Sequence, residues 1–182
     1  MKENLEVHEY LALLNTPCLN QQVKLGFLFS CYTGLRWVDV KRMEWSDLQE
    51  SKLITRIIQK KAGRPVILTL HPVAIAILSQ VRSMIHGECT GKVFTLPRAD
   101  GANKALEQWV SDAGINKHIT LSCARLSFSI LLKDKQVDDP TIAYLLGHST
   151  AKQVPKTYKR HRPKDQTEAI NHLPSHKKTV II

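Results

Sequence analysis

A tyrosine and a histidine lie near each other in LLGHSTAKQVPKTYKRH, residues 145–161, a stretch rich in lysine and arginine. Tyr158 follows His148 by ten residues, in a chain of which aromatic residues make up only 6%. Two interpretations fit this pattern. Tyr158 is either a packed ring at a solvated helix end or a nucleophile that faces a phosphate. The second is chemically reasonable because nearby cations stabilise the phenolate that attack on a phosphate requires.

The charge of the chain favours a polyanionic partner. Its 182 residues are 43% hydrophobic, which is enough for one folded domain with at most a small appendage, and they carry a formal net charge of +10. Many cations lie within the expected folded part: Lys24, Arg36, Lys41, Arg42, Lys60, Lys61, Arg64, Arg82, Arg98, Lys104 and Arg125. We therefore expect a basic track on a folded surface and nucleic-acid binding that salt weakens steeply.

Cysteine spacing and apolar segments indicate the cellular setting. The four cysteines, Cys18, Cys31, Cys89 and Cys123, form no C-x-x-C pair and no cluster with zinc-ligand spacing. We interpret them as reduced and mostly in the core. No signal peptide opens the sequence, and no apolar run approaches the roughly 18 to 20 residues of a membrane helix. An intracellular soluble protein without a membrane partner is expected.

Helices dominate the expected elements. Apolar periodicity and end signals predict helices over residues 6–15, 21–33, 36–43, 71–85, 99–114, 119–134, 138–147 and 164–173. Two β-branched stretches, 51–59 and 65–70, flank the glycine-containing turn 60–64 and predict a β-hairpin. The expected fold class is α+β, mainly helical with a small antiparallel β-sheet. The tryptophans are most simply core residues: Trp37, Trp45 and Trp109.

Four stretches, in this order, resemble the catalytic domain of the tyrosine recombinases, the phage-integrase family of site-specific DNA recombinases. They are YTGLRWVDV, IIQKKAGRPVILTL, SCARLSFSILL and LLGHSTAKQVPKTY. The wording GLRWVDV and CARLSFSILL is nearest to integrases of Bacteroides-type mobile elements. The resemblance extends from about residue 5 to about residue 165. It implies a tyrosine recombinase catalytic domain over 1–165 and a C-terminal tail over 166–182 that packs in cis or in trans.

The resemblance also implies the site residues. The family's two arginines, hairpin lysine, histidine and nucleophilic tyrosine fall on Arg36, Arg125, Lys61, His148 and Tyr158. Lys60 is an alternative to Lys61 as the hairpin lysine. Further DNA-binding cations are expected at Lys60, Arg64, Lys156, Lys159 and Arg160.

One position departs from the family pattern H-x-x-R. The residue three before Arg125 is Ser122, which is either a helix cap, as Thr120 could also be, or a phosphate ligand. Its hydroxyl cannot act as a base near neutrality as imidazole can. His118 precedes Arg125 by seven residues, so on a continuous helix it would point elsewhere.

The implied reaction is in-line attack of Tyr158 on a phosphodiester of double-stranded DNA, which gives a 3′-phosphotyrosyl enzyme and a free 5′-hydroxyl. No metal or other cofactor is required. Arginine suits the site because attack builds charge on the non-bridging oxygens, and a guanidinium binds two oxygens at once. Lys61 is expected to protonate the leaving 5′-oxygen, and His148 to donate to a non-bridging oxygen.

The resemblance implies a bacterial cytoplasmic enzyme, nucleoid-associated on DNA, that is a tetramer on DNA and a monomer alone. We interpret the chain as a catalytic-domain fragment without the family's usual N-terminal DNA-clamping domain. Two alternatives stay open: a DNA-binding relative that has lost turnover, suggested by Ser122, and a type IB topoisomerase. The apolar end TVII, residues 179–182, could add an edge strand to the sheet of its own chain or of a neighbouring protomer.

Overall fold

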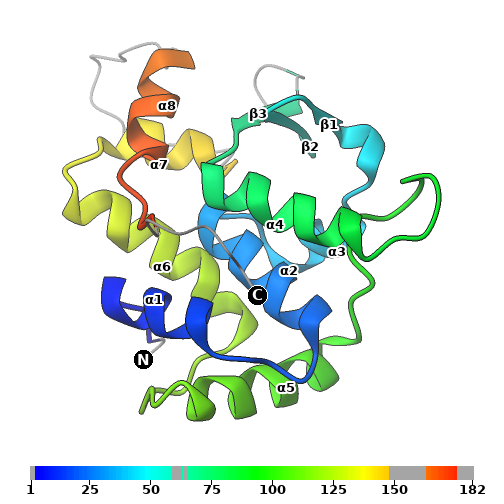
Figure 1. Ribbon diagram of the computed structural model, residues 1–182. Coiled ribbons are helices and arrows are strands. Elements are labelled where there is room, and N and C mark those ends of the chain that lie inside the picture. Colours follow the sequence, from blue (N-terminus) through cyan, green and yellow to red (C-terminus); the bar gives the residue numbers. More distant parts are fainter. Residues whose placement is uncertain (1–2, 59–62, 64, 148–162, 176–182) are drawn as a thin grey trace.

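The computed structural model describes residues 3–58, 63, 65–147 and 163–175. In this part of the chain, helices pack around a central helix, α2, and a small sheet lies at one side of the molecule (Figure 1). Helix α2 contacts α3, α4, α5 and α6. The predicted fold class, mainly helical with a small antiparallel sheet, is confirmed. None of the helices in these ranges is both long and apolar enough to cross a membrane.

Helix α2 (Gln21–Thr33) is the core of the fold because every residue from Val23 to Thr33 is buried. It begins after Asn20, whose side chain accepts a hydrogen bond from the Val23 N–H at 3.0 Å. It ends at Gly34, which has a φ of 69°. A Cβ atom at Gly34 would lie only 2.7 Å from the Phe128 ring, so glycine permits both the left-handed turn and close packing on α6.

Helix α1 (Val7–Asn15) ends beside a buried lysine. The Lys24 Nζ donates to the carbonyl oxygens of Leu14 at 3.2 Å and Thr16 at 2.8 Å, and burial lowers the pKa of this lysine. Its charge lies 5.7 Å from the centre of the Trp109 ring. A cation at the carbonyl end of α1 complements the helix dipole, and it fixes α1 to α2.

The sheet has the order β1-β2-β3 and is antiparallel throughout. Strands β2 (Lys52–Ile58) and β3 (Pro65–Thr69) form the predicted hairpin, with Leu53 opposite Leu68 and an irregular register between Ile54 and Ile58. Strand β1 (Leu48–Gln49) was not predicted, because two residues are too few to show alternation. One face of the hairpin packs on the core.

The remaining helices are α3 (Trp37–Arg42), the 3-10 helix η1 (Trp45–Asp47), α4 (Pro72–Ser83), α5 (Ala99–Asp112), α6 (Leu121–Asp134) and α7 (Asp139–Leu145). All but η1, which was not predicted, lie close to their predicted ranges, and α4 and α7 each begin at a side-chain cap and a proline. For example, the His71 Nδ1 accepts from the Val73 N–H, and the Asp138 carboxylate accepts from the Thr141 N–H.

Helix α8 (Pro163–Ile170) packs against α7 and β3 (Figure 1). The Gln166 amide donates to the Ile67 carbonyl at 2.7 Å and accepts from the Thr69 N–H at 2.8 Å. It therefore occupies two backbone groups at the edge of β3. Because α8 spans residues 163–170, the proposed domain boundary after residue 165 falls inside a helix. The proposed edge strand at residues 179–182 lies outside the described residues.

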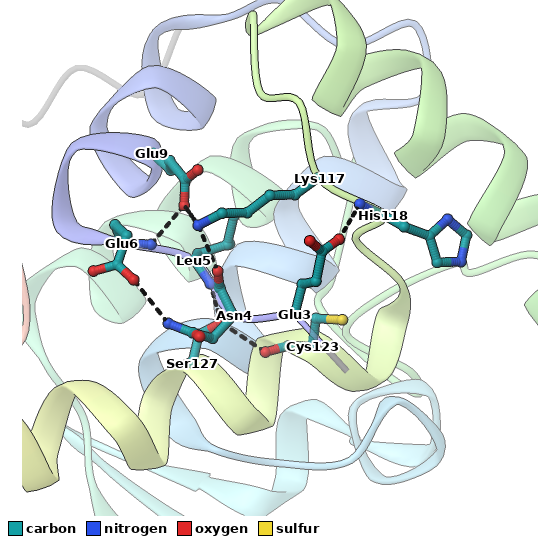
Figure 2. Close-up of polar contacts among 9 residues, drawn as sticks. All are labelled: Glu3, Asn4, Leu5, Glu6, Glu9, Lys117, His118, Cys123 and Ser127. Atoms are coloured by element: carbon teal, nitrogen blue, oxygen red, sulfur yellow. Dashed lines mark hydrogen bonds and ion pairs between the residues drawn. The ribbon is translucent and has the colours of Figure 1, made fainter. Parts of the chain in front are cut away.

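The N-terminal segment is joined to the loop before α6 and to α6 itself (Figure 2). The Leu5 N–H donates to the Ser127 hydroxyl at 2.8 Å, and Lys117 bonds both the Asn4 carbonyl at 3.0 Å and the Glu9 carboxylate at 2.8 Å. The His118 N–H donates to Glu3, while its imidazole is exposed and points away from these contacts. These contacts hold the N-terminal segment against α6, the helix that carries Arg125.

Candidate active site

Arg36 lies in the short connection between α2 and α3. Gly34 ends α2, the buried Leu35 fixes the turn, and Arg36 then adopts an extended backbone as the N-cap residue of α3. Its side chain is 52% exposed, so the guanidinium reaches solvent while the backbone belongs to the turn between the two helices. The Asp39 carboxylate, one turn into α3, lies 4.0 Å from it, which is an ion pair at the limit of contact.

Arg125 lies in the second turn of α6 and joins two other helix ends. Its Nη1 donates to the Gly34 carbonyl at 2.8 Å, and its Nη2 donates to the Leu146 carbonyl at 2.7 Å. These carbonyls follow α2 and α7, whose last C=O groups lack partners within the helix. Two of the five N–H groups of the guanidinium are used in this way, so three keep no partner among the described residues.

The two arginines influence each other electrostatically. Burial and, next, the charge of Arg36 lower the pKa of Arg125 to about 10, while Asp39 opposes this shift. Arg125 is still protonated at neutral pH. The charges of Arg36 and Arg125 therefore repel each other, and a bound anion relieves that repulsion. The arrangement therefore favours a ligand such as a phosphate.

Both arginines line one pocket of about 710 Å³. Other residues on its wall come from α3, α5, α6 and the end of α7, and they include Trp37, Asn103, Thr120, Ser122 and Leu146. The structure thus brings three predicted site residues, Arg36, Ser122 and Arg125, to one place. No three His, Cys, Asp or Glu side chains of the described ranges are grouped so that they could hold a metal ion.

Ser122 is not the cap of α6. Thr120 is the N-cap residue, and its N–H donates to the Cys123 sulfur at 3.3 Å. Ser122 lies in the first turn, exposed on the pocket wall, with its hydroxyl 3.1 Å from the Thr120 hydroxyl. The interpretation of Ser122 as a cap is therefore wrong. A cap precedes the first helical residue, and that residue is Leu121.

The other predicted site residues lie outside the described residues: Lys60, Lys61, Arg64, His148, Lys156, Tyr158, Lys159 and Arg160. However, two described residues that lie near these segments, Gly147 and Ile57, are in contact with each other. Gly147 has a φ of 62°, and a Cβ there would lie 2.7 Å from the Ile57 Cγ2. The residue before His148 thus packs against β2, the strand that leads to Lys60 and Lys61.

Trp37 and Asn103 are among the pocket residues that sequence reasoning missed. Trp37 was expected in the core, but it is half-buried, lines the pocket, and its indole N–H has no partner among the described residues. Its position next to Arg36 was a usable signal. Asn103 lies on α5. It does not interrupt the hydrophobic pattern of that helix, and no motif spacing marked it as a site residue. Only the packing of α5 against α6 placed it there.

Comparisons with known proteins agree with this geometry. A family model described as "Phage integrase family" matches residues 3–165. No curated protein matches the chain. Among solved structures, the integrase from mycobacterium phage Brujita is similar with a TM-score of 0.70 and 18% identity, covering 96% of this chain and 58% of that one.

Two further structures show the same likeness. XerA recombinase has a TM-score of 0.67 and 17% identity, covering 97% of this chain and 65% of its own. The lambda integrase catalytic core has a TM-score of 0.60 and 20% identity, covering 81% of this chain and 92% of its own. This chain therefore spans less than two thirds of the Brujita and XerA chains but most of the isolated lambda core. At these identities the likeness shows the fold.

Proposed function

The chain belongs to the phage integrase family, and on this basis we propose that it is the catalytic domain of a tyrosine-type DNA recombinase. It cleaves and rejoins DNA strands through a 3′-phosphotyrosyl intermediate. We further propose that it acts within a longer protein or assembly that supplies the remaining DNA contacts, and that it derives from a mobile element. The wording of its motifs supports a Bacteroides-type element as the source.

The meeting of Arg36 and Arg125 in one pocket is the observation that supports this function most. The two arginines lie far apart in the sequence, and the fold brings them to the same pocket. A phosphodiester is an anion that gains charge on its non-bridging oxygens as a nucleophile attacks. The Arg125 guanidinium is held by two backbone carbonyls, and Arg36 projects from the turn that carries one of them, so both can donate to that charge.

The reaction assigns roles to this chain's residues. The Tyr158 oxygen forms a bond to phosphorus as the bond from phosphorus to the 5′-oxygen breaks, and the leaving oxygen takes a proton from Lys61. His148 donates to a non-bridging oxygen. A free tyrosine has a pKa of about 10, so its phenolate is scarce at neutral pH. Nearby cations, namely Lys156, Lys159 and Arg160 with the arginine pair, lower that cost.

Double-stranded DNA is the proposed substrate and partner. The net charge of +10 supports a polyanion. One structural relative, lambda integrase, has been solved bound to DNA and as a tetramer on a Holliday junction. We propose a tetramer on DNA for this chain as well, with a monomer in its absence, in the cytoplasm of a bacterium.

A nicked suicide substrate tests the function. Nicked duplexes from the DNA that flanks the gene are incubated with a high concentration of protein, because the domain alone should bind weakly. We expect a denaturation-resistant protein–DNA adduct, which Tyr158→Phe should abolish. The matched control is Tyr10→Phe, which removes a buried hydroxyl that donates to the Cys31 carbonyl at 3.5 Å. An adduct that persists in Tyr158→Phe would refute the assignment of the nucleophile.

A second candidate is a DNA-binding relative without turnover, which Ser122 favours because a serine stands on the pocket wall where the family usually has histidine. Ser122→His separates the two candidates. A large gain in the rate of adduct formation indicates an enzyme that the serine slows. No adduct in either protein, together with retained DNA binding, indicates a binding protein.

A further inference from the structure

Asn103 connects α5 to the first turn of α6. Its Oδ1 accepts a hydrogen bond from the Leu121 N–H at 3.1 Å. Leu121 is the first residue of α6, so this N–H is one of the donors that lack a partner within the helix. Asn103 thereby fixes the start of the helix that bears Ser122 and Arg125. Asn103 and Leu121 both belong to the wall of the pocket that the two arginines line.

The same contact determines which way the Asn103 amide faces. A backbone N–H bonds only to an acceptor, so the oxygen must face Leu121 and the Nδ2 must point the other way. Within the described ranges, Nδ2 has no hydrogen-bond partner, and Asn103 is part of the pocket wall. Two N–H donors of a side chain held at its oxygen are therefore available to a ligand in this pocket.

This part of the pocket contains neutral donors where a histidine is usual in the family. Ser122 stands at that position, and its hydroxyl lies 3.1 Å from the Thr120 hydroxyl on the same wall as Asn103. A serine side chain is much shorter than an imidazole, so it leaves room for a second donor beside it. Both residues are uncharged, whereas Arg36 and Arg125 supply the positive charge.

We propose that Asn103 contacts the DNA phosphate during strand cleavage, which deepens the proposed function and rests on it. Its Oδ1 holds the first turn of α6, and its Nδ2 donates to one non-bridging oxygen of the phosphate bound by Arg36 and Arg125. The Ser122 hydroxyl lies beside the same oxygen. Because neither side chain titrates near neutrality, these two donors persist across the pH range in which an imidazole would change its charge.

Three variants test the proposal through the rate constant for adduct formation at saturating nicked DNA. Asn103→Ala loses both contacts and should slow cleavage about 10- to 100-fold. Asn103→Asp keeps the acceptor for Leu121 and should keep the unfolding midpoint, but it places a negative charge where Nδ2 donates. It should cleave slowly at pH 6 and pH 8 alike, because a carboxyl beside two guanidinium groups stays ionised over this range. Gln108→Ala, on the exposed face of α5, should cleave at the wild-type rate.

A change in the substrate identifies the oxygen. In methylphosphonate DNA, one of the two non-bridging oxygens is replaced by a methyl group, and the two stereoisomers are separable. For the isomer that lacks the oxygen bound by Asn103, the difference between the wild type and Asn103→Ala should shrink to the part due to the lost Leu121 contact. For the other isomer, Asn103→Ala should still be about 10- to 100-fold slower.

The outcomes separate this inference from the function on which it rests. If the wild type cleaves and Asn103→Asp cleaves at the same rate at every pH, the role of Asn103 is overturned and the proposed function stands. An equal defect of Asn103→Ala with both stereoisomers also overturns that role, since that defect would come only from the capping of α6. Absence of any wild-type adduct, or an adduct in Tyr158→Phe, overturns the proposed function and the inference with it.

Discussion

Arg125 has a structural role in addition to its proposed contact with phosphate. Its two terminal nitrogens bond carbonyls at the ends of α2 and α7, and its own backbone belongs to α6. A planar fork with fixed spacing can make both contacts and still present further donors to a ligand, whereas an ammonium group has one centre. Arg36 differs because its side chain is half-exposed and its charged partner, Asp39, is 4.0 Å away.

This difference predicts distinct effects of conservative variants. Arg125→Lys should lower the free energy of unfolding by about 1–3 kcal/mol, since one ammonium cannot replace both hydrogen bonds. Arg36→Lys should change it by less than about 1 kcal/mol. Both variants should slow adduct formation about 100- to 1,000-fold. Urea denaturation and the nicked-substrate assay give the two quantities.

Equal stability of the two lysine variants would show that the carbonyl contacts of Arg125 add nothing to the fold. Retained cleavage in either variant would contradict the proposed arginine pair.

At the scale of elements, the contact between α7 and β2 depends on a glycine. Gly147 ends α7 with a φ of 62°, and the Ile57 Cγ2 lies where its Cβ would be. The sequence showed Gly147 as a helix stop, which is a local property of the left-handed turn. It did not show that β2 packs against that turn, because two elements far apart in the chain meet there.

Gly147→Ala should therefore cost more than an ordinary glycine substitution. We expect a loss of about 1–2 kcal/mol from the left-handed backbone and about 1–3 kcal/mol from overpacking against Ile57. Gly114→Ala is the matched control, because Gly114 has a φ of 71° and nothing within 4 Å of a Cβ. Thermal and urea unfolding measure both changes.

A second variant isolates the clash. Ile57→Ala removes the crowded methyl group, so Gly147→Ala should cost about 1 kcal/mol less in that background. Additive losses in the double variant would mean that the backbone conformation alone explains the cost.

At the scale of the whole molecule, His71 joins segments from three parts of the chain. It caps α4, its ring lies 5.1 Å from the Tyr32 ring of α2, and it bonds the Leu173 backbone after α8. Tyr32 also donates to the Pro174 carbonyl at 2.8 Å. Burial lowers the pKa of His71 to about 4, although the bond to Leu173 opposes the shift. The core therefore holds this imidazole neutral.

The stability of the fold should depend on pH through this group. An unfolded histidine has a pKa of about 6.5. Between pH 6.5 and 4 the unfolded chain binds a proton that the folded chain does not, so acidification favours unfolding. The free energy of unfolding should fall by up to about 3 kcal/mol over this range, in addition to the contribution of the carboxylates. Urea denaturation at several pH values measures it.

His71→Asn provides the control, because asparagine can also cap α4 but does not titrate. The variant should be less stable than the wild type at pH 7, and the two should converge near pH 4. Parallel curves throughout would show that His71 does not titrate as the structure indicates.

The sequence by itself determined the elements and the family. Helix periodicity, the hairpin turn and the stop signals at Gly34 and Gly147 are local, and local patterns can be read without knowing how segments pack. The four motifs also indicated the family correctly. Only the tertiary structure decided that Arg36 and Arg125 share a pocket, that Thr120 caps α6 while Ser122 faces the pocket, and that Asn103 stands beside them. These relations depend on how α2, α5, α6 and α7 pack together, and packing between distant segments leaves no spacing in the chain.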